Sequence, residues 1–440
     1  MSRRQFLLLI IPLVSVLIGF GVLLFVEVTV GGPGVYWDEA LERTVLRTVA
    51  RDFAGTFNEK QQQRAYFRAL DAYLKEIDPY AELVPPWDRA HEREMSEGRY
   101  GGVGIRIDPG PEGGPIEYLE VTGLKPDGPA DQAGIRRLDR IVSVDGASIK
   151  ELCADGTLVQ AQTAIRGKLD SKLPLTLMRG EARLEVTVTR AWVDRGSVFG
   201  LRMIDEERGI GYVRIEAFQD ATARDFRARL KELSARGLRA LVLDLRGNRG
   251  GMLDRAVDVV DALLSSDDIV CVVSRGSKDI YRATKETAVP PDMPLAVLVD
   301  RGSASASEVV AGALQDRRRA VLVGERTYGK FQVQTVRDVR TKLGLGVLKI
   351  TTAVYLTPNG RYLPRRSRDD RSLGGIQPEV PVPVTDDERR RLDTIFENER
   401  LADWNPEQPP VKGDFVDRPL MAAVKLLRGE GVTSRLISDS

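Results

Sequence analysis

Three serines stand in a run of small residues between an apolar strand pattern and an apolar helix pattern. Residues 295–299 form a continuous apolar run typical of a buried strand. The segment Asp300–Glu308 follows it and contains Ser303, Ser305 and Ser307. Small residues at a strand-to-helix turn can leave a hydroxyl accessible beside backbone amides, which is a suitable setting for a nucleophilic serine. The pattern does not choose among the three serines.

A nucleophilic serine needs a base, and lysine is the plausible base in this chain. The chain contains one histidine, His91, which lies in a charged segment away from any small-residue turn. Lys330 follows a second apolar strand pattern, residues 320–323, in a turn that also contains glycine. A lysine acts as a base only as the neutral amine, so its pKa must fall by several units from about 10.4, which burial can achieve. Gln334 could hold the amine through its side-chain amide.

Two strand–loop–helix patterns must position these groups. The first covers residues 240–264 and contains the glycine-rich loop 247–251, and the second covers residues 295–314. Nearly continuous apolar strands are typical of parallel sheets that are covered on both faces. Open α/β sheets build their sites at the carboxyl ends of neighbouring strands. We therefore expect the glycine-rich loop and the serine run to lie at one edge of the sheet.

The remaining patterns divide the chain into a helical part, a β-rich module and a βαβ part. We interpret residues 38–82 as a helical packing unit and residues 87–96 as a charged helical linker. Residues 100–190 alternate as strands do, with glycines at the turns, and βαβ patterning starts at residue 209. The predicted strands are 104–107, 116–121, 140–144, 173–178, 184–189, 210–215, 240–245, 269–273, 295–299, 320–323 and 348–355. The predicted helices of the βαβ part and the tail are 222–233, 254–264, 309–314, 388–400 and 418–427.

Length and composition indicate an ordinary folded protein with more than one domain. The chain has 440 residues, of which 42% are hydrophobic and 29% charged. Its net charge of +1 gives no electrostatic argument for a nucleic-acid partner. Cys153 and Cys271 lie in different predicted domains, and we expect buried free thiols. Because the sequence has no Cys/His cluster and no HExxH pattern, we predict neither a catalytic metal nor another cofactor.

The first thirty residues predict a membrane anchor. Residues 6–26 carry no charge, and a helix of that length at ~1.5 Å per residue spans a hydrocarbon core of about 30 Å. Arg3 and Arg4 precede this run and Glu27 follows it, so the positive-inside rule leaves the N-terminus in the cytoplasm and exports the rest. A cleaved signal peptide is the alternative, but its apolar region would be shorter and an Ala-x-Ala-like exit is missing. We favour the retained anchor, which makes the lipid bilayer a partner.

Four motifs in one order resemble the carboxyl-terminal processing proteases, also called tail-specific proteases. They are Tyr100-Gly-Gly-Val-Gly104, Asp244-Leu-Arg-Gly-Asn-Arg-Gly-Gly251, Gly302-Ser-Ala-Ser-Ala-Ser-Glu308 and Gly329-Lys-Phe-Gln-Val-Gln334. The resemblance implies that Ser305 is the nucleophile, that Lys330, 25 positions later, is the base, and that Gln334 supports the lysine. It also implies an oxyanion hole that combines the amide of Ala306 with one from Gly250 or Gly251.

The resemblance further identifies the β-rich module as a PDZ domain. Its peptide-binding residues would be Gly101, Gly102, Val103, Gly104 and Ile105. Their amides could bind a free C-terminal carboxylate, and the strand that follows could add the peptide as an extra strand. Arg166 lies where the family is expected to have a pocket-sensing arginine. In some relatives this module blocks the active site until peptide binds.

Two residues depart from the family pattern. Arg249 stands where proline is usual in the glycine-rich loop, and Phe331 stands where glycine usually follows the lysine. Neither change removes a reacting group. Both could alter loop geometry or narrow the substrate groove.

We therefore predict an α/β protein with a crotonase-like βαβ protease core, an inserted PDZ domain, an N-terminal helical region and a single N-terminal transmembrane helix. The predicted parts are a cytoplasmic tip and anchor (1–30), a helical region (31–98), the PDZ domain (99–190), the protease core (191–388) and a helical tail (389–440). The predicted function is that of a membrane-tethered serine endopeptidase on the periplasmic side, which recognises substrate C-termini and uses a Ser–Lys dyad.

Two other functions compete with this one. A peptide-binding scaffold with a dead catalytic core is the first alternative, and the intact Ser–Lys pair argues against it. A crotonase-like acyl-CoA enzyme is the second, but it leaves the PDZ module, the export segment and Lys330 without a purpose. A homo-oligomer formed through terminal helices and an activating adaptor, which some relatives need, stay open as partners.

Overall fold

The structure is a computed structural model that describes residues 38–52, 55, 58–111, 113–365, 374–402, 404 and 415–430. The predicted anchor, residues 6–26, lies outside these residues. Within the described part, no helix combines the length and the apolar character needed to cross a bilayer.

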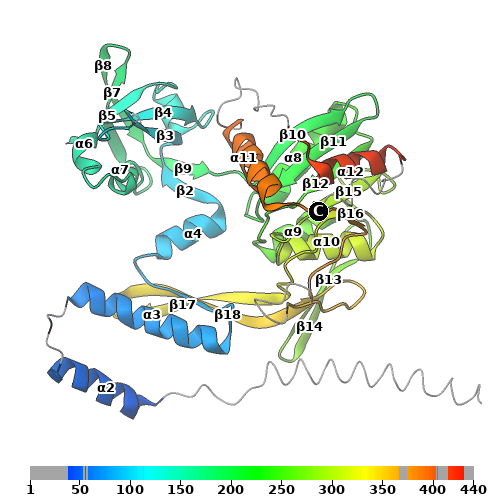
Figure 1. Ribbon diagram of the computed structural model, residues 1–440, viewed down its shortest axis with the longest axis horizontal. Helices are drawn as coiled ribbons and strands as arrows, with labels where there is room; N and C mark the ends of the chain where they lie inside the picture. Colours follow the sequence, from blue (N-terminus) through cyan, green and yellow to red (C-terminus); the bar gives the residue numbers. More distant parts are fainter. Residues whose placement is uncertain are drawn as a thin grey trace, which may run out of the picture.

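A six-stranded mixed sheet forms the centre of the largest unit (Figure 1). Its strands, in spatial order, are β10 (Val198–Asp205), β11 (Ile210–Ile215), β12 (Ala240–Asp244), β15 (Leu295–Val299), β16 (Val321–Gly324) and β19 (Val380–Pro381). β10 is antiparallel to β11, and the other neighbours are parallel. Every residue of β11, β12 and β15 is buried, as their apolar sequences predict. The α/β prediction for this unit is confirmed.

Helices cover both faces of this sheet. Alternate residues of a strand point to opposite faces, and the buried strand residues accordingly fall into two separate clusters. On one face they pack against α8 (Thr222–Ala235), α9 (Leu253–Asp261) and α10 (Ala306–Asp316). On the other face they pack against α12 (Arg418–Leu427). The sheet is therefore rigidly held where its strands end.

A second, antiparallel sheet joins the N-terminal helical region to the core. It contains β1 (Glu82–Val84), β18 (Gly344–Leu356), β13 (Asp268–Ser274) and β14 (Ser277–Arg282) in that order, with β17 (Gln332–Thr341) paired to β18. α2 (Glu39–Asp52) and α3 (Glu59–Ile77) precede β1, and α4 (Arg89–Glu97) follows it. The sequence prediction missed β17 because the strand lacks a continuous apolar run and contains no fully buried residue.

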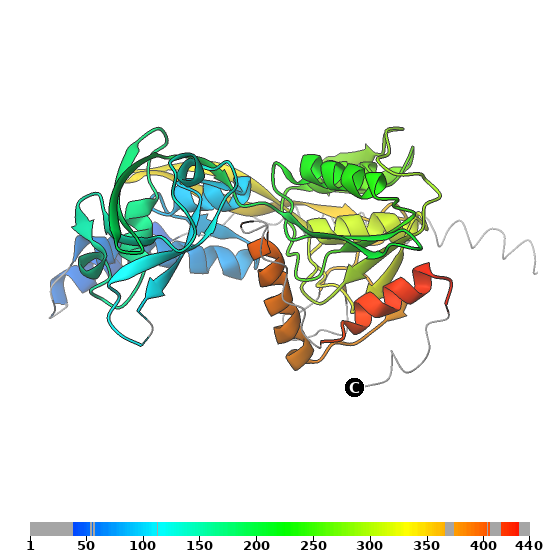
Figure 2. The same cartoon turned by 90° about the horizontal axis from the view of Figure 1, so that it is seen from above.

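A separate unit with its own core contains the predicted PDZ strands. Its sheet has the order β3 (Ile105–Gly110), β4 (Tyr118–Leu124), β5 (Arg140–Val144), β7 (Lys172–Arg179) and β8 (Ala182–Thr189), with β6 (Ala147–Ser148) beside β5. The short helices are α5 (Pro129–Gln132), α6 (Ile149–Leu152) and α7 (Val159–Ile165). Figure 2 shows this unit to one side of the core. Within the described residues, β3 pairs with β4 alone and is an edge strand.

The connection between this unit and the core is the pair of β2 (Arg99–Gly102) and β9 (Ala191–Asp194). Gly101 and Gly102 therefore lie opposite Trp192 and Ala191 in a strand ladder. α11 (Asp386–Ala402) lies between the two units (Figures 1 and 2). The exact domain boundaries stay predictions.

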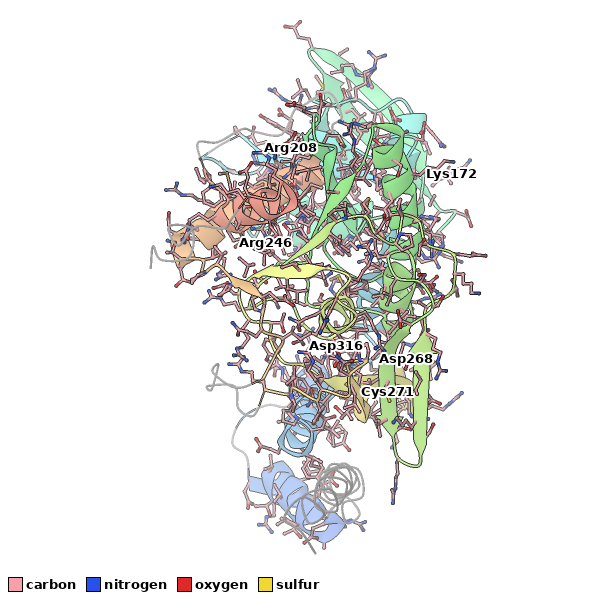
Figure 3. All side chains as sticks on the ribbon, turned by 90° about the vertical axis from the view of Figure 1, so that its right-hand side faces the viewer. Lys172, Arg208, Arg246, Asp268, Cys271 and Asp316 are labelled. Atoms are coloured by element: carbon pink, nitrogen blue, oxygen red, sulfur yellow. The ribbon has the colours of Figure 1, made fainter. Side chains whose placement is uncertain are left out.

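Both cysteines are buried and free, as predicted. Cys271 lies within β13, the strand that begins at Asp268 (Figure 3). Cys153 lies in the hydrophobic core of the PDZ unit.

Candidate active site

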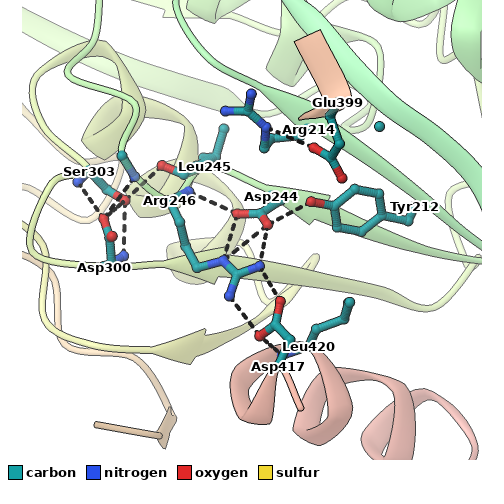
Figure 4. A network of polar contacts seen from close by, with 12 residues as sticks. Tyr212, Arg214, Asp244, Leu245, Arg246, Asp300, Ser303, Glu399, Asp417 and Leu420 are labelled. Carbon is teal, nitrogen blue, oxygen red and sulfur yellow. Dashed lines mark hydrogen bonds and ion pairs between the residues drawn. The ribbon is translucent and has the colours of Figure 1, made fainter. Parts of the chain in front are cut away.

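A buried ionic network fixes the start of the glycine-rich loop (Figure 4). Asp244, at the end of β12, accepts hydrogen bonds from the Tyr212 hydroxyl at 2.8 Å and from the Arg246 amide at 2.9 Å. The Arg246 guanidinium lies between the carboxylates of Asp244, at 2.6 Å, and Asp417, at 2.7 Å. Removing one partner of such a buried pair leaves an uncompensated charge and costs about 3–5 kcal/mol. The residues just before the glycine-rich loop are therefore held in place by this buried network.

The glycine-rich loop and the serine run lie against each other, as expected from the parallel strands. The Gly247 amide donates to Asp300 Oδ1 at 2.9 Å, and the Ala304 amide donates to the Asn248 carbonyl at 3.0 Å. The hydroxyl of Ser303 donates to the Leu245 carbonyl at 2.8 Å. These bonds join the ends of β12 and β15 into one surface.

The structure distinguishes the three candidate serines. Ser303 and Ser307 are fully buried, and their hydroxyls donate to the backbone carbonyls of Leu245 and Asn248, respectively. Ser305 is partly exposed, and its hydroxyl, unlike the other two, donates no hydrogen bond within the described residues. The hydroxyls of Ser303 and Ser307 therefore stabilise the fold, and the Ser305 hydroxyl is available to act as a nucleophile.

The backbone of Ser305 is held in an unusual conformation. Its φ is 55° and its ψ is −116° at the N-terminus of α10. A non-glycine residue in such a region costs about 1–3 kcal/mol and persists only where its surroundings fix it. Here the Ser305 amide donates to Glu308 Oε2 at 2.9 Å, and the Tyr355 hydroxyl donates to the Ser305 carbonyl at 2.9 Å. This sharp turn leaves the hydroxyl partly exposed.

Glu308 connects the serine turn to the lysine turn. Its Oε2 also accepts the Lys330 amide at 2.8 Å, while its Oε1 accepts the Gly329 amide at 2.7 Å and the Thr327 hydroxyl at 2.6 Å. The side chain is fully buried. Burial raises the pKa of Glu308 to about 7, because it outweighs the four hydrogen bonds that favour the carboxylate. In the sequence this residue showed only as the last member of the serine motif.

Lys330 and Gln334 pair as the resemblance implied. Lys330 Nζ donates to Gln334 Oε1 at 2.6 Å, and Gln334 Nε2 donates to the Tyr80 carbonyl at 2.6 Å. The Tyr80 ring centre lies 5.2 Å from the same Nζ. Burial lowers the pKa of Lys330, and the nearby charge of Lys349 lowers it further. In this conformation the described contacts of Nζ include Gln334 and not the Ser305 hydroxyl.

Tyr80 corrects the interpretation of the helical region. Residues 38–82 were expected to form a packing unit, yet the Tyr80 carbonyl accepts from Gln334 and the Tyr80 ring lies beside Lys330 Nζ. Neither helical periodicity nor residue type could reveal this contact. It brings together residues that are 250 positions apart in the sequence.

The hydrogen bonds of the glycine-rich loop favour Gly251 over Gly250 as the second amide of the predicted oxyanion hole. The Gly250 amide donates to Asn248 Oδ1 at 2.8 Å, so it is already used. The amides of Ala306 and Gly251 make no backbone or side-chain hydrogen bond within the described residues. Gly250 is nevertheless close: a Cβ added to it would lie 2.9 Å from Ser305 Cβ and 3.0 Å from the Ala306 nitrogen.

A cleft of about 770 Å³ adjoins these groups. Its lining includes Tyr80, Arg249, Ala304 and Lys330. Arg249 is exposed at the cleft and makes no ion pair among the described residues. The expectation that Phe331 could narrow the groove is wrong, because that ring is fully buried and stacks on Tyr355 with centroids 4.6 Å apart. Phe331 belongs to the hydrophobic core.

The predicted peptide-binding residues lie at a second cavity, of about 350 Å³. Gly102, Val103, Gly104, Ile105 and Arg166 line it, whereas Gly101 is not among its lining residues. Gly101 instead pairs within the β2–β9 ladder.

Comparisons with known proteins agree with this arrangement. The model of Peptidase family S41 matches residues 209–382, and a PDZ-domain model matches residues 120–179. A carboxy-terminal-processing protease of Bartonella bacilliformis is 31% identical over 387 residues, which cover 84% of each chain. A carboxyl-terminal-processing protease of Picosynechococcus is 34% identical over 329 residues, which cover 74% of each chain. Among solved structures, a photosystem II D1 C-terminal processing protease is 32% identical and covers 78% of this chain and 86% of that chain, with a TM-score of 0.41. The chain thus belongs to peptidase family S41, as a carboxyl-terminal processing serine protease with a PDZ domain.

Proposed function

We propose that Ser305 is the nucleophile and Lys330 the general base of a dyad that hydrolyses peptide bonds. The observation that carries this proposal is the role of Glu308, which accepts the backbone amides of both residues and so sets the two turns side by side. The Ser305 hydroxyl donates no hydrogen bond within the described residues, unlike those of Ser303 and Ser307.

The chemistry follows from these positions. The neutral amine of Lys330 takes the hydroxyl proton as Ser305 Oγ attacks the scissile carbonyl. The resulting lysine ammonium gives the proton to the leaving amine, and a water molecule then hydrolyses the acyl-enzyme with the same lysine as base. The amides of Ala306 and Gly251 would stabilise the oxyanion, an effect worth about 2.7–4 kcal/mol per donor.

Gln334 acts as a positioning residue in this scheme. It holds Nζ in the present conformation, so the lysine side chain must turn from Gln334 towards Ser305 before proton transfer. The backbone amides of both residues are already held by Glu308 Oε2.

Replacing the two reacting groups tests the dyad. Purified full-length Ser305→Ala and Lys330→Ala variants are incubated with an unfolded protein and with a peptide that has a free C-terminus. We expect cleavage to fall by more than about 10³-fold in each, with an unchanged thermal midpoint. Ser277→Ala, an exposed serine on β14, serves as the control and should retain full activity. Cleavage that persists in Ser305→Ala would overturn the assignment, and a wild type that binds tails without cleaving them would favour a scaffold.

We also propose that residues 6–26 anchor the protein as a single-pass helix with the catalytic part on the extracytoplasmic side. The uncharged run and the arginines before it support this topology. Alkaline extraction of membranes and protease treatment of spheroplasts test it. Release of the chain by alkali, or a mature N-terminus beyond residue 26, would contradict the anchor.

A further inference from the structure

The peptide groove of the PDZ unit has a second wall from a distant part of the chain. One side of the cavity consists of residues from β3 and α7, including Ile105 and Ile165. The opposite side consists of Glu397, Arg400, Leu401 and Trp404, from α11 and the turn after it. α11 lies between the PDZ unit and the core in both views (Figures 1 and 2). A ligand in this groove would contact both walls.

Specific contacts fix α11 to the PDZ unit. Arg106 Nη1 pairs with Glu397 Oε1 at 2.9 Å, and the Leu124 amide donates to the Trp404 carbonyl at 3.3 Å. Lys125 Nζ lies 5.8 Å from the centre of the Trp404 indole. These contacts hold the second wall against the mouth of the groove.

Stronger contacts fix the same helix to the core. The buried carboxylate of Glu399 pairs with Arg202 at 2.7 Å and with Arg214 at 3.1 Å. Arg400 pairs with Glu216 at 2.5 Å. α11 is therefore fixed to the protease core, and the groove is lined by residues of the PDZ unit on one side and by residues of this helix on the other.

The shape and chemistry of the groove suit an extended peptide. β3 is an edge strand within the described residues, so its free backbone groups can accept an added strand. Val103, Ile105, Ile165 and Leu401 give the cavity apolar surface for a terminal side chain.

The groove carries more positive than negative charge. Arg106, Arg166, Arg195 and Arg400 line it together with one carboxylate, that of Glu397. Glu397 already pairs with Arg106 and Arg400. The closest carboxylate to Arg166 is that of Glu94, at 4.0 Å, and the guanidinium of Arg195 donates to Met95 Sδ at 3.2 Å and has no carboxylate partner among the described residues. This excess of positive charge favours an anionic ligand.

We propose that substrate tails bind between β3 and α11, and that α11 helps to select them. The tail has a free carboxylate, an apolar last side chain and an acidic side chain among the residues just before it, which faces Arg166 and Arg195. Leu401 and Trp404 are specificity-determining residues on the α11 side. This inference deepens the proposed function and rests on its assignment of the PDZ unit to substrate capture.

Peptide binding to the full-length Ser305→Ala protein tests the proposal. The probe is a fluorescein-labelled decapeptide with glutamate in the third-last position and a C-terminal valine, followed by anisotropy. We expect the C-terminal amide and the glutamine version to bind about tenfold more weakly each, a difference of about 1.4 kcal/mol. Equal affinity of the acid and the amide, or of the glutamate and the glutamine peptides, would overturn the proposal.

Variants on the two walls separate the contributions. Leu401→Ser should weaken binding about tenfold, and Arg195→Gln should remove the preference for glutamate over glutamine. Thr394→Ala and Arg391→Gln, on α11 but not among the groove residues, should bind as the parent does. Unchanged binding in Leu401→Ser would exclude α11 from recognition.

Trp404 gives a measurement that needs no destabilising change. Its indole lines the groove, so peptide binding should alter tryptophan emission, and Trp404→Phe should abolish that change. An emission change of the same size in Trp404→Phe would contradict the second wall. Since binding is measured without catalysis, a failed dyad and a failed groove give different results: the first appears as cleavage by Ser305→Ala, the second as binding that ignores α11.

Discussion

Replacing Glu308 by glutamine tests the link between the serine and lysine turns. The carboxylate accepts Ser305 and Lys330 amides on one oxygen, and the Gly329 amide and Thr327 hydroxyl on the other. Glutamine offers one oxygen and one amino group. The amino group fits best on the Thr327 side, because that hydroxyl can rotate and accept from it. The Gly329 amide then loses its acceptor, while the amides of Ser305 and Lys330 keep the remaining side-chain oxygen as theirs.

Two contributions set the difference in unfolding free energy between the wild type and Glu308→Gln. A buried amide without an acceptor costs about 1–3 kcal/mol. The second term is titration: the pKa of Glu308 is raised from 4.5 to about 7. A raised folded-state pKa contributes stability that is complete below the unfolded value of about 4.5 and is lost as the pH rises through about 7. For a shift of this size the loss is about 3 kcal/mol. Glutamine does not titrate, so the variant lacks this loss.

The wild type should therefore be more stable than Glu308→Gln by about 1–3 kcal/mol near pH 5, and this advantage should disappear or reverse by pH 8.5. Thermal midpoints measured between pH 5 and pH 8.5 check this, at about 2–4 °C for each kcal/mol. Glu207→Gln, at an exposed site, is the matched control and should follow the wild type at every pH. A constant difference between wild type and Glu308→Gln across this range would refute the titration argument. A difference that grows with pH would refute its sign.

Three further substitutions give directional results. Gly250→Ala places a methyl group 2.9 Å from Ser305 Cβ at a φ of +105°, so kcat/KM should fall at least about 100-fold, and an unchanged value would show that the loop yields. Lys349→Met removes the charge that, after burial, lowers the pKa of Lys330, so that pKa should rise and the ascending, acidic-side limb of the kcat/KM profile should move to higher pH. A move to lower pH would contradict this electrostatic reasoning. Phe331→Ala should lower stability by about 3–5 kcal/mol in denaturant unfolding, since the ring is fully buried, whereas a loss under about 1 kcal/mol would place the ring outside the core.

The sequence predicted the parts of the fold that depend on local pattern. The predicted strand 210–215 and the continuous apolar run 295–299 are strands with those bounds, and such apolar runs are typical of parallel strands that are buried on both faces. The meeting of the glycine-rich loop with the serine run follows from the same logic, since β12 and β15 are parallel neighbours. The apolar strand patterns in the sequence thus predicted where the candidate active site lies.

Contacts between segments that are distant in the sequence produce no local pattern, so they were not predicted. Tyr80 reaches Gln334 through a backbone carbonyl, which any residue type would supply. β17 was missed because its residues are half exposed and lack apolar alternation. Phe331 departs from the family pattern, and sequence alone could not show that its ring packs against Tyr355 inside the core. The choice among three serines likewise depended on which hydroxyls bond to the loop.

The support of Lys330, the proposed base, comes from outside the core that carries Ser305. Gln334 depends on the Tyr80 carbonyl, and the neighbouring Asp78 accepts the amide of Thr351 on β18 at 2.7 Å. Lys330 itself lies two residues before β17, the partner strand of β18. The N-terminal region, the β17–β18 hairpin and the base thus form one hydrogen-bonded assembly. The serine turn is fixed by the central sheet and by the Tyr355 hydroxyl of β18, which donates to the Ser305 carbonyl at 2.9 Å. Glu308 and Tyr355 both connect the serine turn to the lysine turn, because Glu308 accepts the amides of Ser305 and Lys330 and the Tyr355 hydroxyl also contacts the Lys330 carbonyl at 2.7 Å. The relative position of the proposed nucleophile and base therefore depends on these two buried side chains.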